Sequence, residues 1–268
     1  MGYEKARHSL KKTEIEIIQM INNKKETQED SKIDQLANQG YCILNSVFDQ
    51  SEVERFRVTT LKDLGVMGQT RNTVHSFHLA GFHRFPEQSA IHAELVSNLT
   101  VNSFLTDYYD RHTFYAIGLS DITINRSQQW HTDLLRGKFS HYLQGGIPWQ
   151  NAKQSCIKAL VYLQSSKSLR IVPGSHLSPS PLDDSMLDEL AKSKSIVQLE
   201  LNAGDVVMMD IRALHRGSTD EEMSDAQLAQ NPKILLSTVF GAINSEFTQA
   251  MQLGNAHRMI EWDRKYLT

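Results

Sequence analysis

Histidine beside carboxylate is the pattern in this sequence that could do chemistry. His131 and Asp133 are separated by one residue, and His215 follows far downstream. Iron(II) centres that activate oxygen are held by two histidines and one carboxylate on one face of the metal, which leaves positions open for a co-substrate and O₂. These three residues are therefore the candidate ligands of an iron site.

A second pair with the same spacing, His92 and Glu94, shows why spacing alone is not enough. In a chain of 268 residues with 11 histidines and 31 acidic side chains, such a pair is expected by chance. On a strand, residues i and i+2 point to the same face, whereas on a helix they diverge by roughly 200°. His92 lies in a helical pattern and is expected as a surface helix residue. His131 and Asp133 border a β-rich region, which favours them as the pair that binds one ion.

Composition excludes several other classes of protein. The chain is 40% hydrophobic and 22% charged and has two cysteines, which is typical of a globular protein without a disulfide framework. A net charge of −3 argues against a nucleic-acid partner. No apolar run is long enough to span a membrane, and the first residues lack the apolar core of a signal peptide, so a cytoplasmic location is expected. The zincin, P-loop, Rossmann, nucleophile-elbow and CxxC motifs are absent.

The elements that must position the candidate ligands fall into two groups. Mostly helical segments are predicted at 11–30 (a helix and then a charged, solvated connector that includes 24–30), 51–64, 89–109 and 251–266, with a loop at 70–86. The helix at 51–64 would begin with a capping box formed by Ser51 and Glu54. Short β-rich runs are predicted at 40–44, 116–125, 156–164, 169–172, 196–201, 206–210 and 234–240. This order favours an antiparallel sandwich or barrel with helices packed on one face.

Three sequence elements resemble those of one known family: Gln129–Asp133 (QWHTD), Leu169–His176 (LRIVPGSH), and Gly204-Asp205 ahead of His215. From about Gln39 to Phe240 the chain resembles the phytanoyl-CoA dioxygenase (PhyH-like) family of non-haem iron(II)/2-oxoglutarate-dependent oxygenases. The resemblance implies a mainly β fold with helices (α+β), built on a double-stranded β-helix, the cupin-like jelly roll. It also implies a single domain, with a helical extension at 1–38, a catalytic core at 39–240 and a C-terminal helix at 241–268.

The resemblance also implies the cofactors and the residues that bind them. His131, Asp133 and His215 would bind Fe(II), with 2-oxoglutarate and O₂ as co-substrates and ascorbate as a stimulant. His176 would be a structural loop residue near the site.

The expected contacts to the far carboxylate of 2-oxoglutarate differ from the family pattern. The family usually has an arginine on the strand after the second histidine and a hydroxyl residue two positions past that histidine. This sequence has Lys233 in the first place, and Gly217 in the second with Ser218 one residue late. A lysine can hold a carboxylate as a point charge but lacks the bidentate fork of arginine. Lys233 and Ser218 are thus predicted to bind the co-substrate, with Arg212 and an outward-pointing Arg216 as alternative cations.

The carboxylate at Asp133 favours oxygen transfer, because related halogenases have a small residue there that leaves room for chloride. The predicted function is oxidation, most simply hydroxylation, of a small polar metabolite in natural-product tailoring, with 2-oxoglutarate converted to succinate and CO₂. Arg136 and Trp149 lie in a segment predicted to contact the substrate, and residues 70–86 would form another wall. Two alternatives stay open: a cupin-like metalloenzyme that does not use 2-oxoglutarate, and a non-catalytic jelly-roll binding protein. The sequence does not indicate an oligomeric state.

Overall fold

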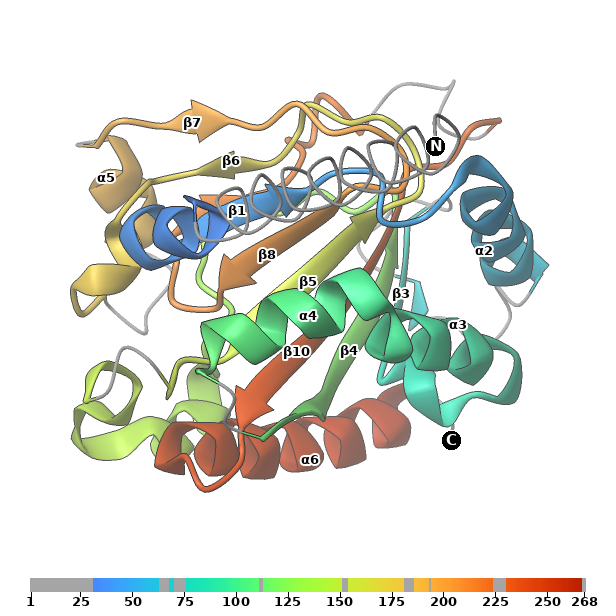
Figure 1. The fold of residues 1–268 in the computed structure, drawn as a ribbon. Helices are drawn as coiled ribbons and strands as arrows, with labels where there is room; N and C mark the ends of the chain where they lie inside the picture. The colour runs from blue at the N-terminus through green and yellow to red at the C-terminus, as the bar shows by residue number, and fades with distance from the viewer. Residues whose placement is uncertain are drawn as a thin grey trace, which may run out of the picture.

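Two antiparallel sheets pack against each other in the protein (Figure 1). The computed structural model describes residues 31–62, 68–69, 76–110, 113–150, 154–180, 186–192, 194–223 and 230–266. The larger sheet has the order β1-β8-β5-β10-β4-β3-β2 and the smaller one β7-β6-β9. Every pairing between these strands is antiparallel. This arrangement confirms the predicted jelly-roll core.

The strands and helices have the following bounds. The larger sheet contains β1 (Tyr41–Leu44), β2 (Gly68–Gln69), β3 (Phe77–Ala80), β4 (Phe114–Ile124), β5 (Ile157–Tyr162), β8 (Val206–Asp210) and β10 (Ile234–Ala242). The smaller sheet contains β6 (Arg170–Ile171), β7 (Val197–Gln198) and β9 (His215–Arg216). The α-helices are α2 (Gln50–Lys62), α3 (Pro86–Ser97), α4 (Leu99–Tyr108), α5 (Leu187–Lys192) and α6 (Glu246–Tyr266). The 3-10 helices are η2 (Phe82–Arg84), η3 (Gly137–Trp149) and η5 (Ser175–Leu177).

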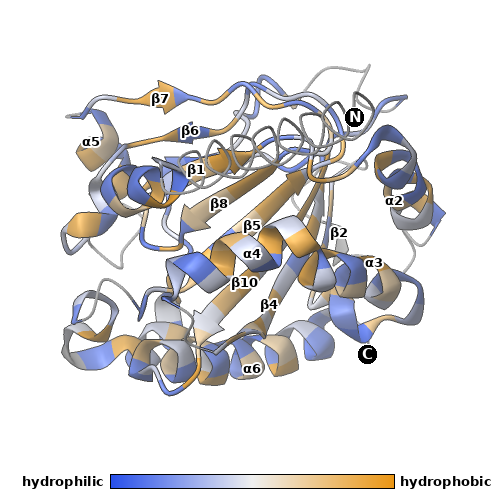
Figure 2. Ribbon diagram, viewed as in Figure 1, coloured by the Kyte–Doolittle hydropathy of each residue, from blue (hydrophilic) through white to orange (hydrophobic). Residues whose placement is uncertain are grey.

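The larger sheet is apolar on both faces because each face has its own partner. Successive side chains on a strand point to opposite faces. Val206 and Met208 of β8 belong to the core that also contains residues of α4, whereas Val207 and Met209 belong to the core that contains Ile171 of the smaller sheet. Figure 2 shows this as strands that are apolar along most of their length. The inner face, between the two sheets, carries the site described below.

Helices cover the outer face of the larger sheet. In Figure 1, α4 crosses in front of the strands and α6 runs along their lower end. The Tyr109 hydroxyl at the end of α4 donates to the carbonyls of Ser155 and Phe240 at 2.8 and 3.2 Å, which fixes α4 to the sheet. Within the described ranges, no helix combines the length and the apolar character needed to cross a bilayer.

Two helix starts differ from the sequence predictions because a different side chain caps the helix. The single helix predicted at 89–109 is α3 and α4, divided at Asn98, whose side chain accepts from the N–H groups of Thr100 and Val101. The cap of α2 is Asp49 rather than Ser51. Its carboxylate accepts from the N–H of Glu52, and the Glu52 carboxylate accepts from the N–H of Asp49, so the capping box lies two residues earlier than predicted.

The segment predicted as a loop at 70–86 contains β3 and η2. β3 pairs with β4 from Phe77 to Ala80, so it gains its hydrogen bonds from a partner strand far away in sequence. Residues 70–75, which include His75, lie outside the described residues, as does the helix predicted at 11–30. Residues 31–39 are helical.

His92 is not a surface residue as expected. Only 9% of it is exposed, and its Nε2 lies 3.1 Å from the Thr238 hydroxyl of β10. The face of α3 that carries His92 packs on the sheet, and its ring also contacts Phe82 edge-on at 5.2 Å between centroids.

The Gly204-Asp205 pair of the family resemblance forms a structural turn before β8. Gly204 has a φ of +87°, and a Cβ there would lie 2.1 Å from the Phe48 carbonyl oxygen, so only glycine fits. The buried Asp205 carboxylate accepts from the N–H groups of Ser46 and Asn202 at 2.8 Å each. The turn therefore sets the start of β8, the strand that leads to His215.

Candidate metal and co-substrate site

The two candidate histidines are neighbours because their backbones form a reciprocal hydrogen-bonded pair. The N–H of His131 donates to the carbonyl of His215 at 2.8 Å, and the N–H of His215 donates back at 2.9 Å. The N–H of Asp133 donates to the carbonyl of Ile211 at 2.8 Å. His131 forms an isolated bridge and Asp133 lies in a bend, so the pair does not sit on a regular strand as expected. Backbone bonds to residues 211–215 align the two side chains instead.

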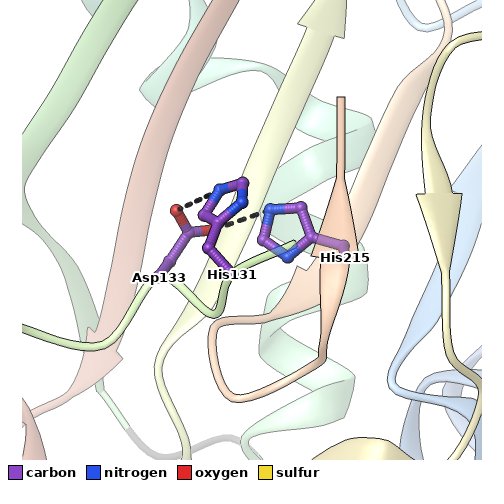
Figure 3. A group of neighbouring side chains, drawn as sticks. All are labelled: His131, Asp133 and His215. Atoms are coloured by element: carbon purple, nitrogen blue, oxygen red, sulfur yellow. Dashed lines mark ion pairs between the residues drawn. The ribbon is translucent and has the colours of Figure 1, made fainter. Parts of the chain in front are cut away.

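The three side chains converge on one point (Figure 3). The Nε2 atom of His131 lies 4.0 Å from Asp133 Oδ1, and the Nε2 atom of His215 lies 3.6 Å from Asp133 Oδ2. One ligand atom from each residue can be chosen so that all three lie within 4.8 Å of one another. This separation suits ligands of a single ion, and His-Asp-His is the donor set of a facial iron(II) site.

Backbone carbonyls orient both imidazoles. The Nδ1–H of His131 donates to the carbonyl of Gln129 at 2.7 Å, and the Nδ1–H of His215 donates to the carbonyl of Ala213 at 3.0 Å. A carbonyl can only accept, so each neutral ring carries its proton on Nδ1 and leaves the Nε2 lone pair for a metal.

Burial and charge keep the three groups in the forms that bind a metal. Burial, together with the neighbouring His215, lowers the pKa of His131 to about 3, and burial also lowers the pKa of His215. Burial alone would raise the pKa of Asp133, but the Lys158 ammonium holds it well below its usual range. His131 Nε2 and Asp133 Oδ2 are buried and have no hydrogen-bond partner among the described residues. An ion at this point would satisfy both atoms, so the residues fit a metal.

Lys158 is one residue of this site that sequence reasoning missed. Its Nζ lies 2.7 Å from Asp133 Oδ1, and its side chain is 12% exposed. It is the second residue of β5. In this strand Lys158, Leu160 and Tyr162 line the inner face and alternate with residues of the outer face. A lone lysine in the apolar run Ile157–Tyr162 was the available signal.

The predicted co-substrate residues, Lys233 and Ser218, line a narrow cavity that His215 of the triad also lines. The lining further includes three residues of β5: Lys158, Leu160 and Tyr162. The Lys233 ammonium donates to the hydroxyls of Ser168 and Ser218, the latter at 2.6 Å, and lies 5.7 Å from the centre of the Tyr162 ring. Burial lowers the pKa of Lys233 to about 8. Within the part of the chain that the structure describes, no carboxylate lies within ion-pair distance of its ammonium.

A larger cavity of about 500 Å³ also borders the triad and shares part of its lining with the narrow one, including Lys158. His131, Asp133 and Arg136 line it, and the Arg136 guanidinium donates to the Thr132 hydroxyl. Of the wall predicted at 70–86, His78 takes part; its Nε2 lies 3.5 Å from Asp121. Asp121 in turn pairs with Arg258 at 3.0 Å.

Other residues singled out from the sequence lie away from both cavities. Trp149 packs on the apolar cluster beneath η3 and α6 and is not among the lining residues, so the structure does not bring it to the site. Arg212 is 3% exposed and bonded to Asp210 at 2.6 Å and to the Pro148 carbonyl, so it is not an alternative cation for the co-substrate. Arg216 lies over the Trp130 ring at 5.9 Å and lines neither cavity.

His176 is not among the three residues whose ligand atoms converge, and it lies in the 3-10 helix η5 rather than in a loop. It is buried, and its Nε2 lies 3.0 Å from the carbonyl of Ala37. Its ring packs beneath Gly40, where a Cβ would come within 2.7 Å of Nδ1. The PGSH segment thus ties the start of β1 to the smaller sheet.

The phytanoyl-CoA dioxygenase (PhyH) family profile matches residues 36–221, and the chain belongs to this family. It is therefore an enzyme of the non-haem iron(II)/2-oxoglutarate-dependent class, with Fe(II), 2-oxoglutarate and O₂ as its cofactor and co-substrates. Comparison with curated protein sequences finds no match.

Solved structures with similar folds include enzymes of the same kind. The alpha-ketoglutarate-dependent epimerase SnoN from nogalamycin biosynthesis has a TM-score of 0.61 at 14% identity, over 81% of this chain and 82% of its own. The carbocyclase SnoK from the same biosynthesis has a TM-score of 0.60 at 18% identity, over 79% and 83%. HygX from Streptomyces hygroscopicus, with nickel, 2-oxoglutarate and hygromycin B bound, has a TM-score of 0.58 at 15% identity, over 80% and 87%. At these identities the similarity shows the jelly-roll fold.

Proposed function

We propose that this enzyme hydroxylates a small polar metabolite in natural-product tailoring, coupled to decarboxylation of 2-oxoglutarate to succinate and CO₂. The observation that carries the proposal is the convergence of His131, Asp133 and His215 within 4.8 Å, with an unpartnered Nε2 and an unpartnered carboxylate oxygen at the same point. Iron(II) bound there would supply the activation of O₂, with electrons from the decarboxylation.

The protein's contribution at the metal end is orientation and charge. Carbonyls of Gln129 and Ala213 fix the two rings, and the neutral imidazoles need no deprotonation before they bind. Asp133 is ionised, so the three donors bring one negative charge. The carboxylate also supports hydroxylation, because it fills the position that halogenases leave open for chloride.

The far end of the narrow cavity supports a dicarboxylate co-substrate. Lys233 is buried, its hydrogen bonds are to hydroxyl groups, and no carboxylate of the described residues lies within ion-pair distance of its ammonium. A carboxylate there would supply the ion-pair partner, through a charge-assisted hydrogen bond. Ser218 accepts from Lys233 and keeps its own hydroxyl proton for the same carboxylate. In this assignment, 2-oxoglutarate lies along β5 between Lys233 and the triad.

The larger cavity supports a polar substrate. Its lining carries more cations than carboxylates: Arg126, Arg136, Lys138, Lys158 and Arg258 against Asp121 and Asp133. Pockets for small molecules are usually mostly apolar with few polar groups. This lining therefore favours a substrate with several oxygen atoms or an anionic group, with Arg136 as a contact. SnoN and SnoK are described as enzymes of nogalamycin biosynthesis, and HygX was solved with hygromycin B bound. Both compounds are natural products, which supports the natural-product assignment.

Anaerobic titration of the protein with iron(II) and then 2-oxoglutarate tests the cofactor part of the proposal. A visible charge-transfer band is expected, and the absence of that band in the wild type would contradict the proposal. The reaction is tested by admitting oxygen in the presence of candidate polar metabolites and following succinate and product mass. Hydroxylation predicts a gain of one oxygen atom. A loss of two hydrogen atoms or an unchanged mass with a new isomer would assign another outcome.

A further inference from the structure

Lys158 stands at the junction of the two cavities and next to the candidate ligands, and nothing in the family resemblance assigns it a role. It lines both cavities, and its ammonium contacts one oxygen of Asp133 at 2.7 Å. The other oxygen, Oδ2, is buried and unpartnered on the side of His215. Lys158 therefore occupies Oδ1 and leaves Oδ2 to face the point where the ligand atoms converge.

The backbone fixes this position. Lys158 pairs with Met209 of β8 on one side and with Val239 of β10 on the other, in the middle of the larger sheet. Its inward direction follows from the alternation that sends Ala159 and Val161 into the outer core. The register of β5 therefore directs the side chain into the site, where the ammonium contacts Asp133.

We propose that Lys158 is a positioning residue that weakens the binding of the metal and strengthens the binding of the anionic co-substrate. This inference rests on the proposed function. Hydrogen-bond partners of metal ligands are usually neutral or anionic groups that raise ligand basicity, and their loss lowers metal affinity. A cation in that position has the opposite effect on metal affinity, because it repels a divalent ion and draws electron density from Asp133. It attracts a dicarboxylate that lies along β5.

The same charge favours binding of the metal before the co-substrate. The two neutral histidines, the Asp133 carboxylate and the Lys158 ammonium sum to zero, so these four groups do not attract a divalent cation by net charge. Once the metal is bound, the site carries an excess of positive charge that a dianion neutralises. Lys158 thus makes the binding of the metal weaker and the binding of 2-oxoglutarate stronger.

Calorimetric titration of Lys158→Met with nickel(II), a redox-inert substitute for iron(II), and then with 2-oxoglutarate tests the proposal. The Kd for nickel(II) is expected to fall by about tenfold, and the Kd of the nickel-loaded protein for 2-oxoglutarate to rise by about tenfold. Lys158→Arg keeps the charge and should keep both wild-type affinities. Lys192→Met, an exposed lysine on α5 that pairs with Glu189 and lines neither cavity, is the matched control.

Weaker or unchanged nickel(II) binding in Lys158→Met would overturn the proposal, because an ordinary ligand-supporting residue gives that result. If Lys158→Met does not fold, the polar Lys158→Gln carries the same test. Failure of the wild type to bind nickel(II) or 2-oxoglutarate would instead refute the proposed function, so the two failures are distinguishable.

Discussion

Two lysines face the same narrow cavity, and they differ in what compensates their charge. Lys158 has a protein carboxylate, Asp133, at 2.7 Å. Lys233 is also buried, but its contacts are the hydroxyls of Ser168 and Ser218 and the Tyr162 ring. Burying a charge is costly unless it is paired. The first lysine is therefore satisfied by the fold itself, whereas the second is suited to a carboxylate that comes from outside.

The largest expected effect comes from removing the carboxylate at the metal end. Asp133→Ala should abolish succinate formation, because the donor set loses its anionic member and Lys158 is left as an unopposed cation beside two imidazoles. Succinate is measured with saturating iron(II) and 2-oxoglutarate. Asp121→Asn changes a carboxylate in the larger cavity that is not a candidate ligand, and it should still bind the metal. Unimpaired turnover in Asp133→Ala would refute the ligand assignment.

Removing the Lys233 cation at the other end of the narrow cavity should affect the binding of 2-oxoglutarate alone. Lys233→Met is expected to raise the Kd for 2-oxoglutarate by about 100-fold, since a hydrogen bond to a charged group is lost in a buried place. Metal affinity should stay at the wild-type level. Lys233→Arg, which restores the side chain usual in the family, should recover most of the affinity. Equal loss of metal and co-substrate binding in Lys233→Met would show that the two ends are not separate.

Replacing each lysine should have a different effect on the free energy of unfolding of the metal-free protein. Lys158→Met strands the Asp133 carboxylate, which is 13% exposed, and should lower the free energy of unfolding by about 2 kcal/mol. Lys233→Met removes a buried cation that has no carboxylate partner among the described residues, and should leave the stability unchanged or raise it by about 1 kcal/mol. Urea unfolding at neutral pH measures both. Destabilisation of the same size in both variants would contradict the comparison.

The sequence predicted elements whose signal is local. β8 was predicted at 206–210 and is found at Val206–Asp210, because an apolar run begins at a glycine turn and every side chain in it is buried. The candidate ligands were proposed from residue type, spacing and the family resemblance. Their side chains converge, although backbone bonds to residues 211–215 rather than a regular strand align them. Such features depend on neighbours in the chain or on the chemistry of the donors.

What the sequence did not reveal depends on partners far away in the chain. β3 is a strand because it pairs with β4, and His92 is buried because α3 packs on β10. In the sequence, Lys158 is an isolated lysine in an apolar run. Its inward direction follows from the register of β5 between β8 and β10. Its partner, Asp133, lies on another segment. Trp149, in contrast, looked like a substrate contact from composition, but the fold uses it for packing.

The affinity for 2-oxoglutarate should depend on pH because Lys233 can lose its charge. Burial lowers the pKa of Lys233 to about 8; the Glu222 charge opposes this shift and the Arg170 charge reinforces it. Burial also raises the pKa of the adjacent Tyr162, which stays neutral. Below pH 8 the ammonium is charged and binds a carboxylate; above it the free lysine is neutral. The Kd for 2-oxoglutarate should therefore be constant below pH 8 and rise by up to about tenfold per pH unit above it. Lys233→Arg should remove this rise, and a rise that persists in Lys233→Arg would assign it to another group.

The smallest expected effect separates the two hydroxyls that hold Lys233. Ser218 lines the narrow cavity, whereas Ser168 contacts the same ammonium but is not among the lining residues. Ser218→Ala should raise the Kd for 2-oxoglutarate by about fivefold, the value of one hydroxyl hydrogen bond, and Ser168→Ala should leave it near the wild type. Calorimetry on the nickel-loaded variants measures both. Equal effects would mean that both serines act only by orienting Lys233, whereas a selective effect of Ser218 would support a direct bond from its hydroxyl to the far carboxylate.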